Sequence, residues 1–212
     1  MIDYFSNDMI FVKANAEEAD SLTAKKYSVS GYPTFVLTDA KGEEIDRIVG
    51  YMEAGPFLET VNNYLQGIGT LDDLLAKAAD STDRMLYYEI AEKYKYRGGS
   101  DEAKMWYEKI LAAGEPTDSL AGEVKIALAD MVLRNKEYDA ALAEFGTIEK
   151  DFKGTPFGET AILYQAYIYR SKLNDTTKAI SEYERFVKEY PNSEDAEYAT
   201  NKAKELKGEA EE

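Results

Sequence analysis

A small residue followed four positions later by an aromatic one occurs three times in this sequence, at a constant interval of 38 residues. The pairs are Ala103 and Tyr107, Ala141 and Phe145, and Ala179 and Tyr183, each followed three positions later by Ile110, Ile148 or Phe186. A period of this length is typical of stacked helical hairpins, because one hairpin cannot bury its apolar stripe alone. The period therefore predicts an all-α hairpin solenoid, with an irregular helical bundle as the alternative.

Another small residue lies twelve positions before the first two pairs, as Ala91 and Ala129. In the third unit this spacing falls on Tyr167, and Ala166 takes the place if the next turn holds one extra residue. Together with Pro191, the pattern resembles the tetratricopeptide repeat (TPR), in which paired helices meet at small residues. The resemblance implies hairpins near residues 84–113, 120–152 and 156–190, and a capping helix at 193–206.

Composition limits the functions open to this chain. Its 41 acidic and 25 basic residues give a net charge of −16, which disfavours nucleic acid and anionic membrane surfaces as partners. No apolar run approaches the roughly 18–20 residues that span a bilayer, so we expect no membrane insertion. Cysteine and histidine are both absent, so we expect no enzyme activity, no cofactor and no metal. Acidic pairs such as Asp72 and Asp73 stand at predicted helix starts, where carboxylates favour the helix dipole.

Residues 1–67 differ from the repeats and predict a three-stranded α/β module. The expected elements are a strand at Ile10–Val12, a helix at Glu17–Tyr27, strands at Phe35–Leu37 and Ile45–Tyr51, and a helix that begins at Gly55–Pro56. With the segment Val29-Ser30-Gly31-Tyr32-Pro33-Thr34-Phe35, this order resembles the C-terminal part of a thioredoxin-like domain. The resemblance implies that Pro33 is a cis-proline beside bound peptide; alternatively, Pro33 simply starts a strand.

The departure from that family concerns its chemistry. The family's Cys-x-x-Cys segment would precede Met1, so its redox activity is not carried onto this chain. A central strand of the family is missing as well, which leaves residues 10–12 and 35–37 without a neighbour. We expect these two runs to pair directly in parallel, or residues 1–67 to form a weak homodimer.

The TPR resemblance also implies a peptide-binding groove along the first helix of each hairpin. The positions that face such a groove are Met85, Tyr88, Glu92 and Tyr96, then Ile126, Asp130 and Arg134, then Leu163, Tyr167 and Arg170. They combine aromatic and aliphatic anchors with charges of both signs, as a peptide groove does. The alternative is a solvated inner face without a ligand.

The interpretation is a truncated thioredoxin-like module at 1–67 joined to TPR-like repeats at 68–212. We expect a non-catalytic scaffold that binds a protein or peptide partner. The alternative is a dithiol-less fragment of a thioredoxin-family thiol–disulfide oxidoreductase. The segment from Ala179 to Ala196 is similar to repeats of periplasmic proteins that coordinate envelope assembly. This implies a periplasmic or envelope-associated location if a signal precedes the chain, and a cytoplasmic one otherwise.

Overall fold

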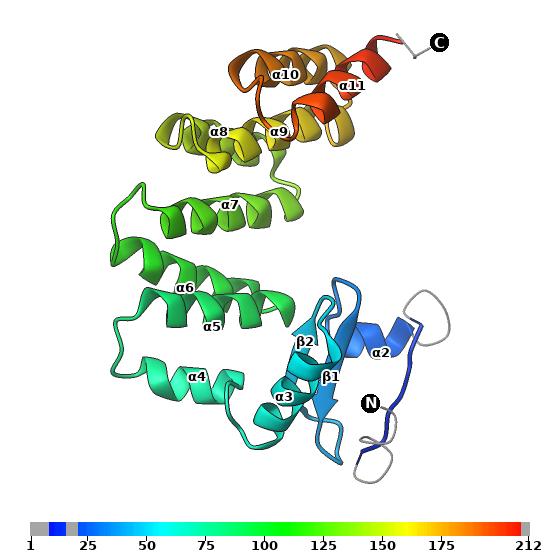
Figure 1. Ribbon diagram of the computed structural model, residues 1–212, viewed down its shortest axis with the longest axis vertical. Helices are drawn as coiled ribbons and strands as arrows, with labels where there is room; N and C mark the ends of the chain where they lie inside the picture. Colours follow the sequence, from blue (N-terminus) through cyan, green and yellow to red (C-terminus); the bar gives the residue numbers. More distant parts are fainter. Residues whose placement is uncertain (1–8, 16–20, 209–212) are drawn as a thin grey trace. The chain divides into compact units, whose positions relative to one another are not determined.

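The computed structural model describes residues 9–15 and 21–208, and in these ranges it is mostly helical, with ten helices and a two-stranded sheet (Figure 1). Contacts divide the chain into two compact units, one up to Ala113 and the other from Gly114 onward. The first predicted hairpin thus belongs to the same unit as the thioredoxin-like residues. The boundary proposed at residue 67 stays a prediction.

The sheet of the first unit is an antiparallel hairpin of β1 (Thr34–Thr38) and β2 (Glu44–Val49). The turn between the two predicted strands is held by the Asp39 carboxylate, which accepts hydrogen bonds from the backbone N–H groups of Lys41 and Glu43, while Gly42 takes a φ of 78°. Helix α3 (Ala54–Leu65) packs on the hairpin. Together they form a small core of Leu37, Ile48, Phe57 and Val61.

The predicted third strand is wrong. Residues 9–15 have no regular structure, and Ile10, Phe11 and Val12 are 93%, 66% and 75% exposed. The direct parallel pairing of residues 10–12 with 35–37 is also wrong, because β2 is the partner of β1 in the described sheet. An apolar run predicts burial, but a strand also needs a neighbouring edge to satisfy its backbone groups. Met9 packs against the hairpin core.

The helix expected at Glu17–Tyr27 is present as α2 (Ser21–Lys26), and residues 16–20 lie outside the described part of the chain. Helix α4 (Leu71–Ala78) follows α3 after a short turn. Thr70 caps α4 by accepting the Asp73 backbone N–H, and the Asp73 carboxylate reaches back to the backbone N–H of Gly69. This reciprocal cap fixes where the chain leaves α3 and enters α4.

The first hairpin consists of α5 (Arg84–Tyr96) and α6 (Ser100–Ala112), close to the predicted bounds. Asp83 caps α5 by accepting the Met85 backbone N–H. The small residues Ala91 and Ala103 are fully buried, so the two helices approach closely. Tyr107 and Ile110, which keep the 38-residue period, are fully buried as well.

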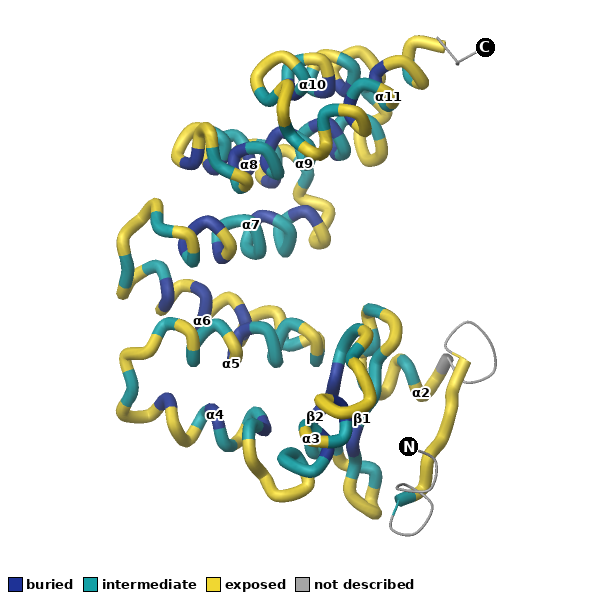
Figure 2. Tube along the Cα trace, viewed as in Figure 1, coloured by how far each residue is buried: buried dark blue, intermediate teal, exposed yellow. Residues whose placement is uncertain are grey.

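Over its described residues, 114–208, the second unit contains five helices. They are α7 (Ser119–Arg134), α8 (Tyr138–Asp151), α9 (Pro156–Ser171), α10 (Thr176–Glu189) and α11 (Ala196–Lys207). Buried positions recur along each helix and alternate with exposed ones (Figure 2). They include every remaining member of the periodic set, namely Ala129, Ala141, Phe145, Ile148, Ala179, Tyr183 and Phe186. The helical-hairpin prediction is therefore confirmed within this unit.

In the third hairpin, the buried small residue is Ala166, whereas Tyr167 is partly exposed. The connection between α9 and α10 spans residues 172–175, one residue more than the connection 135–137 between α7 and α8. The extra residue inferred from the sequence is therefore present.

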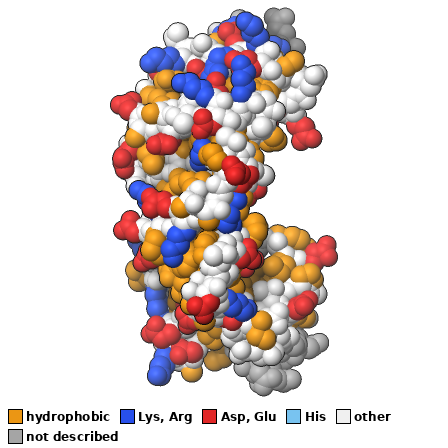
Figure 3. Space-filling view, turned by 90° about the vertical axis from the view of Figure 1, so that its left-hand side faces the viewer, with side chains coloured by type: hydrophobic (Ala, Val, Ile, Leu, Met, Phe, Trp, Pro, Cys, Tyr) orange, Lys and Arg blue, Asp and Glu red, His pale blue; other side chains and the backbone are white. Residues whose placement is uncertain are grey.

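Side chains of both charges lie interspersed with apolar ones on the face drawn in Figure 3. The acidic excess is not confined to one patch of that face.

Candidate functional site

A buried carboxylate on β2 joins three elements of the first unit. The side chain of Asp46 is fully buried, and its Oδ2 accepts the backbone N–H of Leu71, the first residue of α4 (2.8 Å). Its Oδ1 accepts a hydrogen bond from the ammonium of Lys93 and lies 3.0 Å from Nη2 of Arg97. A charge taken out of water is tolerated where it is paired and hydrogen-bonded, and here both conditions hold. Asp46 therefore fixes α4 and α5 against the sheet.

A second set of polar contacts reinforces this junction. Arg47 is buried, and its guanidinium donates to Glu44 (2.8 Å) and to the backbone carbonyls of Tyr27 (2.7 Å) and Tyr96. Nε of Arg97 donates to the same Glu44 carboxylate at 3.0 Å. The β-hairpin and the end of α5 thus share one network.

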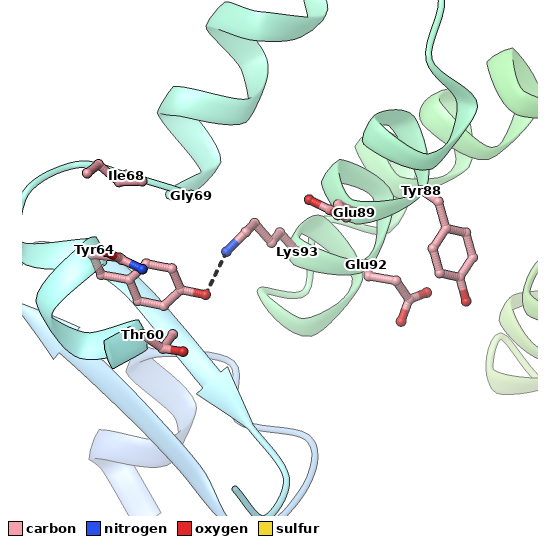
Figure 4. Close-up of a pocket in the computed structure, with 9 residues that line it drawn as sticks. Thr60, Tyr64, Ile68, Gly69, Tyr88, Glu89, Glu92 and Lys93 are labelled. Atoms are coloured by element: carbon pink, nitrogen blue, oxygen red, sulfur yellow. Dashed lines mark hydrogen bonds between the residues drawn. The ribbon is translucent and has the colours of Figure 1, made fainter. Parts of the chain in front are cut away.

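Beside the junction lies a cavity of about 430 Å³ between α3 and α5 (Figure 4). It is lined by Thr60, Asn63, Tyr64, Ile68, Gly69, Tyr88, Glu89, Glu92 and Lys93. From α5, Lys93 reaches toward Tyr64 on α3, and its ammonium donates to the tyrosine hydroxyl at 3.1 Å. The same ammonium lies 4.6 Å from the ring centroid. The volume lies within the range of roughly 300–1,000 Å³ that is common for small-ligand sites.

Two of the predicted groove residues, Tyr88 and Glu92, lie side by side on the α5 wall of this cavity (Figure 4). The Tyr88 ring is tilted against that of Tyr107, with centroids 6.2 Å apart. Glu92 accepts hydrogen bonds from the hydroxyl of Tyr107 and from the ammonium of Lys95. Burial and the bond to Glu92 raise the pKa of the Tyr107 hydroxyl, which therefore stays protonated and donates.

The other predicted positions on α5 do not line the cavity. Met85 and Tyr96 are exposed, and the Lys95 ammonium lies 4.9 Å from the Tyr96 ring centroid. Conversely, Tyr64 and Lys93 could not be predicted as lining residues, because Tyr64 lies outside the repeats and Lys93 lies off the family's groove positions. Helical spacing in α3 indicated a packed helix but not which residues would face α5.

In the second unit, the predicted positions on α7 are partly buried or exposed. Asp130 and Arg134 form an ion pair of 2.6 Å, and Ile126 is half-buried. Tyr164 of α9 stacks on Phe145, with ring centroids 4.5 Å apart. Burial, and next the Asp130 carboxylate, raise the pKa of the Tyr164 hydroxyl. The charge of Asp130 on α7 therefore disfavours ionisation of Tyr164 on α9.

The predicted positions on α9 have different surroundings. Leu163 packs against the core formed with α10 and α11, so part of its surface is used for folding. The Tyr167 ring is partly exposed, and a hydrogen bond to Tyr167 raises the pKa of Lys172. Arg170 is partly buried and donates to the Ser171 hydroxyl at 3.1 Å. Whether these side chains contact a ligand stays a prediction.

The peptide bond between Tyr32 and Pro33 is cis, and both residues are exposed at the start of β1. Within the ranges that the structure describes, no three acidic side chains gather as ligands of a metal ion. None of the helices in the described part of the chain is both long enough and apolar enough to cross a bilayer.

Comparison with known proteins separates the same two parts. Residues 5–65 match the family described as Thioredoxin-like domain, and residues 160–193 match the Tetratricopeptide repeat. No curated protein matches the sequence.

Two solved structures are similar to this chain. The crystal structure of BtubC (BKLC) from P. vanneervenii has a TM-score of 0.51 and 16% sequence identity, covering 73% of this chain and 68% of that one. The crystal structure of MamA has a TM-score of 0.47 and 20% identity, covering 76% and 88%. At this identity, the likeness to BtubC concerns the fold alone. The family matches show that the chain joins a thioredoxin-like sequence at residues 5–65 to a tetratricopeptide repeat at residues 160–193, and it contains no cysteine.

Proposed function

We propose that the protein is a non-catalytic scaffold that binds a protein or peptide partner through the inner faces of its helical hairpins. The observation that carries the proposal is the cavity in the first unit, whose lining includes Tyr88 and Glu92 of the predicted groove on α5 and Tyr64 on α3. A half-exposed aromatic ring beside hydrogen-bonding groups is typical of interface anchors. The tetratricopeptide match supports the same function, since such repeats generally bind protein partners.

The second unit supports the proposal with a comparable set of side chains. Asp130 and Arg134 supply paired charges, and Tyr167 supplies a partly exposed ring. A partner peptide that displaces water from these groups would gain both apolar burial and hydrogen bonds.

The alternative function, a dithiol-less fragment of a thiol–disulfide oxidoreductase, has less support. Residues 5–65 match the thioredoxin-like domain, but the chain contains neither a thiol nor an imidazole. Thiol–disulfide exchange needs a thiolate as the attacking group.

Peptide pools test the scaffold function. Fluorescein-labelled peptides of about seven residues, randomised without cysteine, are titrated with the protein, and anisotropy reports binding. We expect Tyr88→Ala, Ile126→Ala and Arg134→Ala to weaken binding, by about 30-fold where the residue is an anchor. Lys104→Ala is the matched control, because its ion pair with Glu108 is exposed on α6. If all three variants bind like Lys104→Ala with unchanged helicity, the groove assignment is wrong.

We also propose weak self-association through residues 1–67. Support comes from the exposed apolar side chains of Ile10, Phe11 and Val12. It also comes from β1, which pairs on one edge with β2 and on its other edge with no strand among the described residues. Light scattering at several concentrations tests this, and a strictly monomeric mass at high concentration contradicts it. The envelope location inferred from the sequence stays a proposal, to be tested by fractionating cells that express the native gene.

A further inference from the structure

We infer that the cavity between α3 and α5 accepts an arginine side chain of the partner peptide. This inference rests on the proposed scaffold function and names the chemistry that its first-unit site recognises. It also assigns a binding role to α3, the last helix of the thioredoxin-like part.

The walls of the cavity are suited to the stem of a long side chain. Tyr64 of α3 and Tyr88 of α5 present partly buried rings, and Ile68 in the turn after α3 is 49% exposed. An arginine carries three methylene groups that pack on apolar surface while its charged head stays at the water side. A short polar side chain would leave these walls uncovered.

The charged groups of the cavity are suited to the head of that side chain. Glu89 is exposed on α5 and makes no hydrogen bond or ion pair with any residue that the structure describes. Glu92 also lies on the α5 wall, one helical turn from Tyr88, but its carboxylate is already bonded by the Tyr107 hydroxyl and the Lys95 ammonium, so Glu89 is the carboxylate open to a guanidinium. A guanidinium can bond a carboxylate through two parallel N–H groups and can stack on an aromatic ring.

The cation already present does not oppose this assignment. The Lys93 ammonium bonds the buried Asp46 carboxylate at 3.0 Å and the Tyr64 hydroxyl at 3.1 Å, so its charge is committed to the junction. It also holds the Tyr64 ring in place from the side of α5 (Figure 4). The lysine therefore positions one wall and leaves Glu89 as the unpaired charge.

Other ligands fit less well. An acidic side chain would meet the carboxylates of Glu89 and Glu92. A purely apolar side chain would remove water from Glu89 without replacing its hydrogen bonds, which costs free energy. The chain's net charge of −16 adds a long-range attraction for cationic partners and repels acidic ones.

The test uses three peptide pools that differ at one central position. The position holds arginine, citrulline or glutamate, and the flanking positions are randomised without cysteine. Citrulline keeps the shape of arginine but has no charge. We expect the arginine pool to bind about tenfold more tightly than the citrulline pool, and the glutamate pool to bind least.

Glu89→Gln supplies the matched variant, since this exposed side chain has no structural contact to lose. It should reduce the preference for arginine over citrulline to about threefold or less. Glu108→Gln removes an exposed carboxylate from α6 and should leave the preference unchanged. Ile68→Ala should weaken the arginine and citrulline pools alike, because it removes only a contact with the stem.

The outcomes separate this inference from the function on which it rests. If peptides bind and Tyr88→Ala weakens them, but arginine and citrulline pools bind equally, the scaffold function stands and the arginine assignment is overturned. The same conclusion follows if Glu89→Gln behaves like Glu108→Gln. If no pool binds at all, both the inference and the scaffold function are wrong.

Discussion

Replacing Asp46 by asparagine tests the junction that holds the first unit together. The substitution keeps the shape of the side chain but removes the charge that faces Lys93 and Arg97, both only 15% exposed. Removing one partner of a fully buried ion pair costs about 3–5 kcal/mol. Because the two cations keep some access to water, we expect the lower end, about 3 kcal/mol of unfolding free energy.

The single tryptophan provides the assay. Trp106 lies on α6 in the first unit and is 6% exposed, so its fluorescence follows the unfolding of that unit in urea. With a slope of about 2 kcal/mol per molar, a loss of about 3 kcal/mol lowers the midpoint by about 1.5 M. Following one unit also avoids treating a two-unit chain as a single transition.

Lys77→Ala is the matched control for that experiment. Lys77 pairs with Asp73 at 2.7 Å, but its side chain is 56% exposed, so we expect a loss of no more than about 0.5 kcal/mol. The reasoning is refuted if Asp46→Asn lowers the midpoint no further than Lys77→Ala does.

Three further predictions concern packing, pH and chemistry. Gly158→Ala should destabilise the second unit by about 1–3 kcal/mol in thermal unfolding, because its Cβ would lie 2.5 Å from the Phe152 carbonyl oxygen; Gly146→Ala, with its nearest neighbour 4.0 Å away, should be neutral or stabilising. Burial opposes ionisation of Glu149, but hydrogen bonds led by that from Arg185 outweigh it and lower the pKa below its ordinary 4.5. This carboxylate therefore stabilises the fold above about pH 4.5 and loses that effect on acidification, so Glu149→Gln should flatten the acid side of a midpoint-against-pH curve, and an unchanged curve contradicts this. The purified protein should show no dithiol-dependent reduction of insulin by turbidity, because it has no thiol, and measurable turnover would overturn the non-catalytic assignment.

The repeats could be predicted from the sequence because their burial is periodic. Ala141 and Phe145 are on the same face of a helix, and a 38-residue spacing repeats that face in each hairpin. The small residue of the irregular third unit could be predicted as well. A small side chain is needed where the two helices of a hairpin approach closely, and Ala166 is the buried residue there.

The N-terminal strand could not be predicted correctly from local pattern alone. Ile10, Phe11 and Val12 favour a strand by composition, but strand formation depends on a neighbour that can be far away in sequence. In the described residues, β1 pairs with β2, so this segment remains exposed.

The polar junction around Asp46 could not be predicted from the sequence either. In the sequence, Asp46 and Arg47 are two adjacent charged residues between Ile45 and Ile48, and charged residues are ordinarily exposed. The burial of Asp46 arises because α4 begins with an N–H directed at its carboxylate and α5 supplies Lys93. These partners lie 25 and 47 residues away, and no local rule connects them.

The junction and the cavity are parts of one physical arrangement. Asp46 holds the Lys93 ammonium, which in turn bonds the hydroxyl of Tyr64, so the ring on the α3 wall is fixed before any ligand arrives. A wall that is already ordered loses less conformational entropy on binding, which favours affinity without additional contact area. In the proposed scaffold, the thioredoxin-like residues therefore need no thiol to contribute to binding: β2 supplies the buried carboxylate, α3 supplies an aromatic wall of the cavity, and α5 supplies the proposed groove.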